Sequence, residues 1–367
     1  MNLLDRLKTK GPKRILSLDG GGIRGLLALG FLERIETILR ERYGRPDLLL
    51  RDYFDLIGGT STGAIIAACL SIGQGAAEVR ERYLRLGGKV FGSFKWKQWQ
   101  ARFDERPLAA ELKAIFGDRT LGDESITTGL CIIVKRGDTG STWPLFNHPE
   151  GRFFAENREI LVRDALRAST AAPVYFMPKK ITLRRNETCT FVDGGVSMAN
   201  NPALQLFLLA TLQGFPLRWP TGADCLMLVS LGSGSWYTRE DPDRLAKARI
   251  WDWAARVPMQ LMADASMQNQ LLLQYLSHSP TACRIDAEVG DLSDDLLGAQ
   301  PALHYLRYDV LLEPEAMEEL GFAPEQAEKL RSMSAAENRF DLAALSQAAA
   351  KRVHVEHFPA VFDLRFD

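Results

Sequence analysis

The stretch Arg-Ile-Leu-Ser-Leu-Asp-Gly-Gly-Gly-Ile-Arg-Gly, residues 14–25, decides the fold class. It opens with an apolar run that is typical of a short buried strand, and the glycines that follow end this run. After Gly25, apolar residues recur at helical spacing up to residue 39, with charged residues between them. The stretch therefore predicts a strand, a glycine-rich loop and a helix in direct succession.

The same succession recurs along the chain. Residues 53–57 predict a second strand, residues 58–63 a tight turn, and the apolar residues 64–72 a second helix. Further apolar runs predict strands at 130–134, 190–192 and 226–231. Strands that alternate with helices indicate an α/β fold with a largely parallel sheet.

The character of the sequence changes from about residue 241. Residues 251–276 are predicted to be helical throughout, and residues 314–350 are rich in Ala, Glu, Leu and Lys, which favour helix. We therefore divide the chain into three parts. They are an N-terminal segment (1–13), an α/β domain (14–235) and a mainly helical C-terminal portion (236–367), which we expect to be a lid, a regulatory element or packing.

Composition and charge exclude several classes of protein. The chain has 367 residues, of which 46% are hydrophobic and 25% are charged, and these fractions exclude a mostly disordered protein. The 45 basic residues balance 46 acidic ones, so no chain-wide basic field exists to bind a nucleic-acid polymer. The five cysteines form no close pair, which argues against a disulfide scaffold or a zinc ribbon, and no metal site is predicted.

The sequence shows no targeting or membrane-spanning segment. Its N-terminus is polar and lacks the apolar segment of a secretory signal. The longest apolar stretches, near residues 64–72 and 204–212, are far shorter than the roughly 20 residues of a spanning helix. We therefore expect a cytoplasmic protein that reaches a membrane only from the water side.

Gly59-Thr60-Ser61-Thr62-Gly63 fits the G-x-S-x-G pattern of a nucleophile elbow. It follows a predicted strand and opens a predicted helix, which is the setting that this pattern requires. Gly59 and Gly63 let strand and helix approach closely, and Ser61 would project from the turn at the helix N-terminus. The other interpretation is a plain turn in which Ser or Thr caps the helix.

The loop Asp19-Gly20-Gly21-Gly22-Ile23-Arg24-Gly25 has three interpretations. Gly20, Gly22 and Gly25 satisfy the G-x-G-x-x-G pattern of a dinucleotide-binding turn. However, Asp19 would repel a pyrophosphate, and the next predicted strand does not end in the acidic residue that binds a ribose. We favour an oxyanion hole formed by the backbone amides of Gly20, Gly21 and Gly22. A turn without any ligand is the third interpretation.

Asp193, in Asp193-Gly194-Gly195, follows a predicted strand and is a candidate base for Ser61, because the carboxyl ends of parallel strands line the ligand crevice. The alternative is that Asp193 only caps a turn. A histidine could also be the base of a Ser-Asp-His triad. None follows a buried strand directly, and His278 is the best candidate among His148, His278, His304, His354 and His357.

Taken in order, the motifs at 19–25, 59–63 and 193–195 resemble those of the patatin-like phospholipases. Supporting stretches are FGDRTLGD (116–123), ASTAAP (168–173) and NNP (200–202), so the resemblance covers about residues 14–235. It implies a three-layer patatin-like α/β fold with a mostly parallel central sheet, followed by the mainly helical C-terminal portion. Asp-Gly-Gly stands where many members have Asp-Gly-Ala, a departure of little consequence.

The resemblance also implies a function. Family members hydrolyse lipid acyl esters with a Ser-Asp dyad and need neither histidine nor metal. Carried over by position, Ser61 is the nucleophile, Asp193 the base, and the amides of Gly20, Gly21 and Gly22 the oxyanion hole. The motif residues that support them are Asp19, Arg24, Gly25, Gly59, Gly63, Gly194 and Gly195.

A dyad of this kind makes a physical demand on Asp193. A free carboxyl with a pKa near 3.9 is a poor match for an alcohol proton, so burial should raise the pKa of Asp193. Asp193 would take the Ser61 proton during attack on the ester and return it to the leaving alcohol. Water would then release the fatty acid from an acyl-enzyme.

Residues 94–103, Phe-Lys-Trp-Lys-Gln-Trp-Gln-Ala-Arg-Phe, interleave aromatic and basic side chains. This pattern suits an anionic phospholipid membrane surface, although the aromatic rings could instead pack inward. The order of the parts also resembles bacterial cytosolic patatin-like proteins, some of which look like anti-phage effectors switched on by cyclic dinucleotides. We therefore expect peripheral association with the inner membrane face and a cyclic-dinucleotide activator, with no cofactor for catalysis; a homo-oligomer is left open.

Two other functions stay open at this point. One is a general serine esterase that uses His278 in a triad. The other is a nucleotide-binding oxidoreductase that uses the loop Gly20–Gly25.

Overall fold

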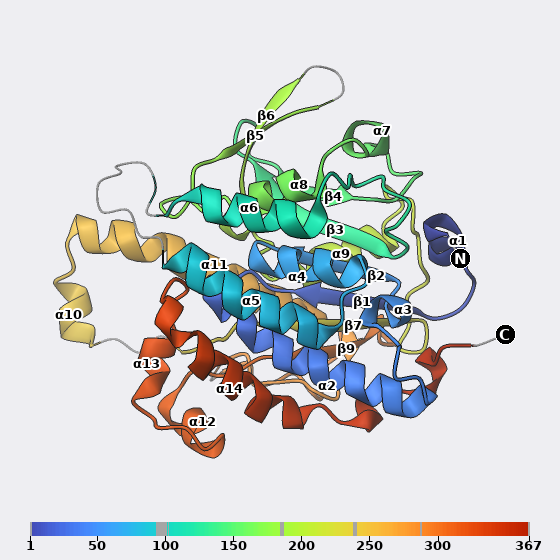
Figure 1. Ribbon diagram of the computed structural model, residues 1–367. Helices are drawn as coiled ribbons and strands as arrows, with labels where there is room; N and C mark the ends of the chain where they lie inside the picture. Colours follow the sequence, from blue (N-terminus) through green and yellow to red (C-terminus); the bar gives the residue numbers. More distant parts are fainter. Residues whose placement is uncertain are drawn as a thin grey trace.

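The computed structural model describes residues 2–92, 101, 103–183, 187–237, 241–286 and 288–365 (Figure 1). Its centre is a nine-stranded sheet with the order β5-β6-β3-β2-β1-β7-β9-β8, and β4 pairs with β3. The strands are β1 (Lys13–Leu18), β2 (Leu56–Thr60), β3 (Gly129–Arg136), β4 (Thr142–Phe146), β5 (Lys179–Thr182), β6 (Thr188–Asp193), β7 (Leu226–Leu231), β8 (Ser277–His278) and β9 (Leu303–Tyr308).

Six neighbouring strands of the sheet, from β3 through β2, β1, β7 and β9 to β8, run parallel. Strands β4 and β6 pair antiparallel with β3, and β5 pairs antiparallel with β6. The predicted α/β fold with a mostly parallel sheet is confirmed. The antiparallel edge matters for the site, because it brings the C-terminal end of β6 beside β3.

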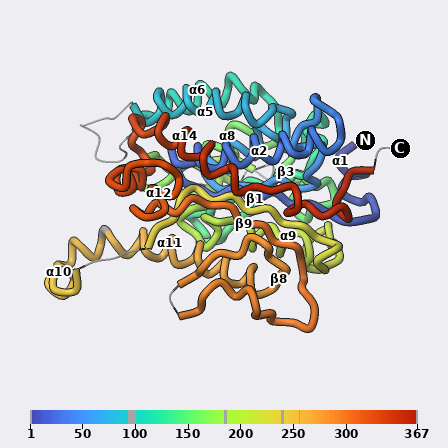
Figure 2. Tube along the Cα trace, turned by 90° about the horizontal axis from the view of Figure 1, so that it is seen from below, coloured from blue at the N-terminus to red at the C-terminus, as the bar shows by residue number. Residues whose placement is uncertain are grey.

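Helices cover both faces of the sheet and make three layers (Figures 1 and 2). One face carries α2, α4, α5, α6, α8 and α14, and the other carries α1, α9 and α11. The helices are α1 (Leu3–Lys8), α2 (Leu26–Tyr43), α3 (Leu50–Tyr53), α4 (Thr62–Ser71), α5 (Ala76–Phe91), α6 (Glu105–Phe116), α7 (Phe154–Asn157), α8 (Val162–Ser169), α9 (Ala203–Thr211), α10 (Pro242–Ala246), α11 (Ile250–Tyr275), α12 (Pro314–Glu319), α13 (Gln326–Leu330) and α14 (Arg339–Ala349).

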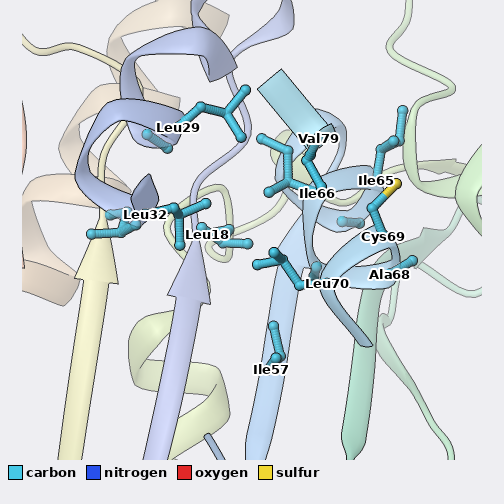
Figure 3. Packing of buried hydrophobic residues seen from close by; sticks show 14 of the residues in the cluster. Leu18, Leu29, Leu32, Ile57, Ile65, Ile66, Ala68, Cys69, Leu70 and Val79 are labelled. Carbon is cyan, nitrogen blue, oxygen red and sulfur yellow. The ribbon is translucent and has the colours of Figure 1, made fainter. Parts of the chain in front are cut away.

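Alternation along the strands builds two hydrophobic cores. In β1, Leu16 and Leu18 face the core under α2 and α4, whereas Ile15 faces the core under α9. Figure 3 shows how Leu18 and Ile57 meet the apolar side chains of α2 and α4. Since both faces of each central strand are buried, the strands read as continuous apolar runs.

Two elements differ from the sequence-based expectation. The strand predicted at 53–57 is wrong in its first half, because α3 ends at Tyr53 and β2 begins only at Leu56. The Asp52 carboxylate accepts the Leu49 N–H at 2.9 Å, and this contact closes a helical turn where an apolar run had suggested a strand. In addition, the C-terminal portion supplies β8 and β9 to the sheet, so it contains two strands besides its helices.

The C-terminal portion packs closely against α2. Ser346 in α14 accepts a hydrogen bond from the Gly30 N–H at 2.8 Å and donates one to the Leu27 carbonyl at 2.7 Å. A Cβ on Gly30 would lie 2.3 Å from the Ser346 hydroxyl, so only glycine allows this approach. The division of the chain at residue 236 remains a prediction.

Within the described part of the chain, no helix combines the length and the apolar character needed to span a membrane.

Candidate active site

Ser61 occupies a sharp turn between β2 and α4. Its backbone has φ +54° and ψ −124°, a strained conformation for a residue with a side chain. Two glycines make the turn fit: a Cβ on Gly59 would lie 2.3 Å from the Gly63 carbonyl carbon, and a Cβ on Gly63 would lie 2.3 Å from the Leu18 oxygen. The strand, the helix and the end of β1 therefore meet backbone against backbone, and Ser61 is left partly exposed.

The Ser61 hydroxyl donates a hydrogen bond to Asp193 at the end of β6, with 2.6 Å between Oγ and Oδ2. The other carboxylate oxygen accepts the Gly195 N–H at 2.7 Å. On the backbone side, the Ser61 N–H donates to the Ser169 hydroxyl at 2.8 Å, and that hydroxyl donates to the Ile133 carbonyl at 2.6 Å. The structure thus brings together two predicted site residues that are 132 positions apart, and Ser169 of the ASTAAP stretch orients one of them.

Burial sets the protonation of this pair. Only 3% of Asp193 is exposed, and this burial raises the pKa of its carboxyl to about 6. The hydrogen bonds from Ser61 and Gly195 and the positive charge of Arg167 act in the opposite direction but do not cancel the burial. A carboxylate with this pKa is still ionised at neutral pH, and it is a stronger base than an exposed aspartate.

The glycine loop lies beside Ser61, but its three amides are not equivalent. The Gly20 N–H donates to the Asn200 carbonyl at 3.0 Å, so it is already engaged. The Gly21 N–H makes a longer contact of 3.3 Å with the Thr62 hydroxyl, and Gly21 and Gly22 line the same cleft as Ser61. The geometry therefore favours Gly21 and Gly22 over Gly20 as donors. Gly25, Gly194 and Gly195 are buried around them.

The geometry argues against a dinucleotide at this loop. Gly22 has φ +59°, and a Cβ there would lie 2.2 Å from the Met333 carbonyl oxygen. That oxygen also accepts the Ile23 N–H at 2.9 Å. Met333 in the C-terminal portion thus occupies the Ile23 amide, one of the loop amides that a pyrophosphate would bind.

Asp19 and Arg24, the charged residues of the loop, are both buried. The Asp19 carboxylate pairs with Arg307 on β9 at 2.8 Å, and both side chains are only 5% exposed. Arg307 also donates to Ser230 at 2.8 Å and pairs with Asp309 at 3.1 Å. Arg307 could not be predicted from the sequence, because its strand lies in a portion without a recognisable motif. Arg24 stacks over Trp236, 4.9 Å from the ring centroid.

An apolar cleft opens above Ser61 and Asp193, and about 800 Å³ of space lies between its walls when the solvent at its open side is included. Its walls come from α5 and α6, from the segment after α8, and from two parts of the C-terminal portion. The apolar lining side chains are Ile65, Tyr83, Leu86, Val90, Phe91, Leu108, Ala172, Tyr175, Phe176, Val196, Met262 and Met333. Such a lining accepts a hydrocarbon chain.

All five histidines are described, and none lines this cleft. His278 lies instead against His304, with 3.2 Å between their Nδ1 atoms. His148 accepts the Glu150 N–H. The structure therefore does not bring His278 to Ser61 as a triad would require. Within the described ranges, no group of His, Cys, Asp and Glu side chains is arranged to hold a metal ion. The aromatic and basic stretch 94–103 falls outside the described residues except for Ala101 and Phe103.

Comparison with known proteins identifies relatives for more than half of the chain. The family model described as patatin-like phospholipase matches residues 16–207. A protein named cGAMP-activated phospholipase, from Vibrio cholerae serotype O1, is 32% identical over 206 residues, which cover 53% of this chain and 56% of the relative. A protein of the same name from Escherichia coli strain TW11681 is 28% identical over 279 residues, which cover 72% of this chain and 76% of the relative.

Patatin group J-1 of Solanum tuberosum is 28% identical over 237 residues, which cover 60% of each chain. The chain thus spans less than two thirds of the length of the Vibrio and potato relatives.

The pKa of Asp193 predicts how fast Ser61 reacts with a fluorophosphonate at different pH values. Only the carboxylate can accept the Ser61 proton, and its pKa of about 6 means that the labelling rate should fall about tenfold per pH unit well below pH 6. Gel-based labelling between pH 4.5 and 8 measures this rate. Asp193→Asn should label at least ~100-fold more slowly than wild type at pH 8, where the wild-type carboxyl is ionised, and the two rates should converge at low pH. A wild-type rate that stays constant down to pH 5, while thermal unfolding shows an intact fold, would argue against Asp193 as the base.

Loss of the Arg307 charge should destabilise the fold strongly. Arg307→Met leaves the buried Asp19 carboxylate without its cation, and this should lower the free energy of unfolding by about 3–5 kcal/mol in urea titrations. Asp19→Asn in the same chain should restore part of the loss. The matched control is Arg82→Met, which removes an exposed helical pair with Glu78 and should cost less than about 0.5 kcal/mol. Equal losses for the two single variants would contradict the assignment.

Proposed function

Because the chain belongs to the patatin-like phospholipase family, we propose that it hydrolyses acyl esters of membrane phospholipids with a Ser61–Asp193 dyad. The observation that carries this proposal is the 2.6 Å hydrogen bond from the Ser61 hydroxyl to the buried Asp193 carboxylate, beneath an apolar cleft. No imidazole is required, because burial gives the carboxylate the basicity that the proton transfer needs.

The reaction proceeds in two halves. In the first, Ser61 Oγ forms a bond to the ester carbonyl carbon while its proton moves to Asp193 Oδ2. The tetrahedral intermediate collapses, the bond to the lysophospholipid oxygen breaks, and Asp193 returns the proton to that oxygen. In the second half, Asp193 takes a proton from water as the water attacks the acyl-enzyme. The fatty acid then leaves, and Ser61 regains its proton.

The amides of Gly21 and Gly22 stabilise the negative oxygen in both halves. They lie beside Ser61 on the wall of the cleft, and a backbone N–H needs no reorganisation to receive the charge. Gly20 contributes in a different way. A Cβ at residue 20 would lie 3.3 Å from the Ser61 Cβ, so the lack of a side chain on Gly20 leaves space beside Ser61. The Gly20 N–H holds the loop in place through Asn200.

The cleft favours a long-chain ester as the substrate. Each methylene moved from water into an apolar lining contributes about 0.8 kcal/mol of binding free energy. Because the lining is almost entirely apolar, it rewards a fatty acyl chain and offers few partners to a polar acyl group.

We further propose that a cyclic dinucleotide switches the enzyme on during antiviral defence, at the cytoplasmic face of the cell membrane. Two relatives carry the name cGAMP-activated phospholipase. The match to the Escherichia coli protein covers 72% of this chain, which is more than residues 1–235 can contain. The similarity therefore extends into the C-terminal portion, which supplies Met262 and Met333 to the cleft and is suited to regulate it.

Release of fatty acid from phosphatidylcholine–phosphatidylglycerol vesicles tests the proposed reaction. Ser61→Ala should reduce the rate at least ~10³-fold, and Asp193→Asn at least ~10²-fold, because each removes a reacting group. Ser71→Ala, a control at the far end of α4, should keep the wild-type rate, and so should His278→Ala. Fatty acid release by wild type that survives Ser61→Ala would rule out the dyad.

Addition of cGAMP tests the proposed activation. The fatty acid release rate should rise at least ~10-fold, and the thermal unfolding midpoint should rise with ligand concentration, because a ligand that binds only the folded state stabilises it. Cyclic di-GMP and cyclic di-AMP define the specificity. If none of the three changes either the rate or the midpoint, the activator proposal falls while the hydrolase proposal stands.

A further inference from the structure

The N-terminal half of α11 stands clear of the body of the protein. The helix has 26 residues and is about 39 Å long. Its C-terminal half is anchored, since the buried Asn269 donates to the carbonyls of Met198 and Asn201 and Leu273 lies in the core. The N-terminal half and α10 project away from the sheet, as Figures 1 and 2 show from two directions.

This projecting half exposes large apolar side chains. Trp251 is 81% exposed, Ile250 79% and Leu261 62%, and Trp253 and Val257 are also exposed. Ile250, Trp253, Val257 and Leu261 are spaced by three or four residues, so they share one face of the helix. Trp251 lies about 100° around the helix from Ile250, at the edge of this face. A continuous apolar face of this kind on a water-exposed helix marks an interaction surface.

The charges around this face are balanced. Arg244, Lys247 and Arg249 are exposed on α10 and on the turn that leads into α11, and so are Asp241, Asp243 and Asp252. Tryptophan suits the boundary between lipid headgroups and acyl chains, where the ring is partly buried. A phospholipid bilayer, whose headgroups carry charges of both signs, therefore fits both the apolar face and its balanced charge.

The same helix reaches the active-site cleft. Met262, the residue after Leu261, lines the cleft. One turn further on, the Ser266 hydroxyl lies 3.5 Å from the Asn200 amide, and Asn200 holds the glycine loop through Gly20. A surface that docks through the first half of α11 would therefore lie next to the cleft that receives the acyl chain.

We propose that α10 and the N-terminal half of α11 are a lipid-docking surface, in which Ile250, Trp251 and Leu261 insert into a phospholipid bilayer. This inference rests on the proposed function, because it names the place where the enzyme meets its substrate surface. The docking surface delivers a phospholipid to Ser61 without a change in the dyad.

Vesicle cosedimentation of the Ser61→Ala protein tests the proposal without any hydrolysis. The probe is phosphatidylcholine vesicles with and without 30 mol% phosphatidylglycerol, each with and without cGAMP. The parent protein should pellet with at least one of these vesicle preparations. The triple variant Ile250→Gln, Trp251→Gln and Leu261→Gln should bind at least ~10-fold more weakly, because three large side chains no longer leave water. The control is Phe340→Gln, which replaces a side chain on α14 that is 60% exposed, and it should bind like the parent.

Activity assays separate this proposal from the proposed function. In the wild-type background, the triple variant should lose at least ~10-fold in fatty acid release from vesicles and should keep its turnover of a soluble short-chain ester. The two proposals can also separate in the other direction. If the wild-type protein binds vesicles but releases no fatty acid, and the triple variant does not bind, the docking surface is supported and the hydrolase proposal is overturned.

Three results would overturn the docking surface. They are a parent protein that binds none of the vesicles, a triple variant that binds them as the parent does, and light scattering that shows a dimer of the parent which the triple variant abolishes. The last result would assign this face of α11 to a second copy of the chain. Thermal unfolding of all variants verifies that each one is folded.

Discussion

Direct contact between backbones around Ser61 is the constraint on which the site depends. Gly59 touches the start of α4, and Gly63 touches the end of β1, at distances that no Cβ could occupy. This contact forces Ser61 into its strained conformation and directs its hydroxyl toward the end of β6. The antiparallel pairing of β6 with β3 then places the carboxylate at hydrogen-bond distance. The serine and its partner are therefore positioned by the sheet, and flexible loops have little part in it.

The sequence was sufficient for the elements that have a local pattern. β1, β3, β6 and β7 were predicted as apolar runs, and the three motifs identified Ser61, Asp193 and the glycine loop. Features that depend on distant residues were not predictable from one sequence. β9 lies in a portion without motifs, and nothing local relates Arg307 to Asp19, which is 288 residues away. The engagement of the Gly20 amide was also hidden, because it depends on the position of Asn200.

The C-terminal portion is part of the site although no motif lies in it. It supplies the cation for Asp19 through β9, one wall of the cleft through α11, and a carbonyl that covers the glycine loop through Met333. The contact of Ser346 with Gly30 joins the same portion to α2. A shift of β9, α11 or Met333 would therefore act directly on the glycine loop or the cleft, and this is a physical basis for the proposed control of the activity by a ligand.

The contacts of the glycine loop with Arg307 and Met333 also order events during synthesis. A chain still growing on the ribosome contains the serine, the carboxylate and the glycines long before it contains residues 303–333. Until that late segment emerges, Asp19 lacks its ion pair with Arg307 and Gly22 its covering carbonyl, so the loop lacks its final geometry. The proposed hydrolase would therefore gain its complete glycine loop only after residues 303–333 have been made.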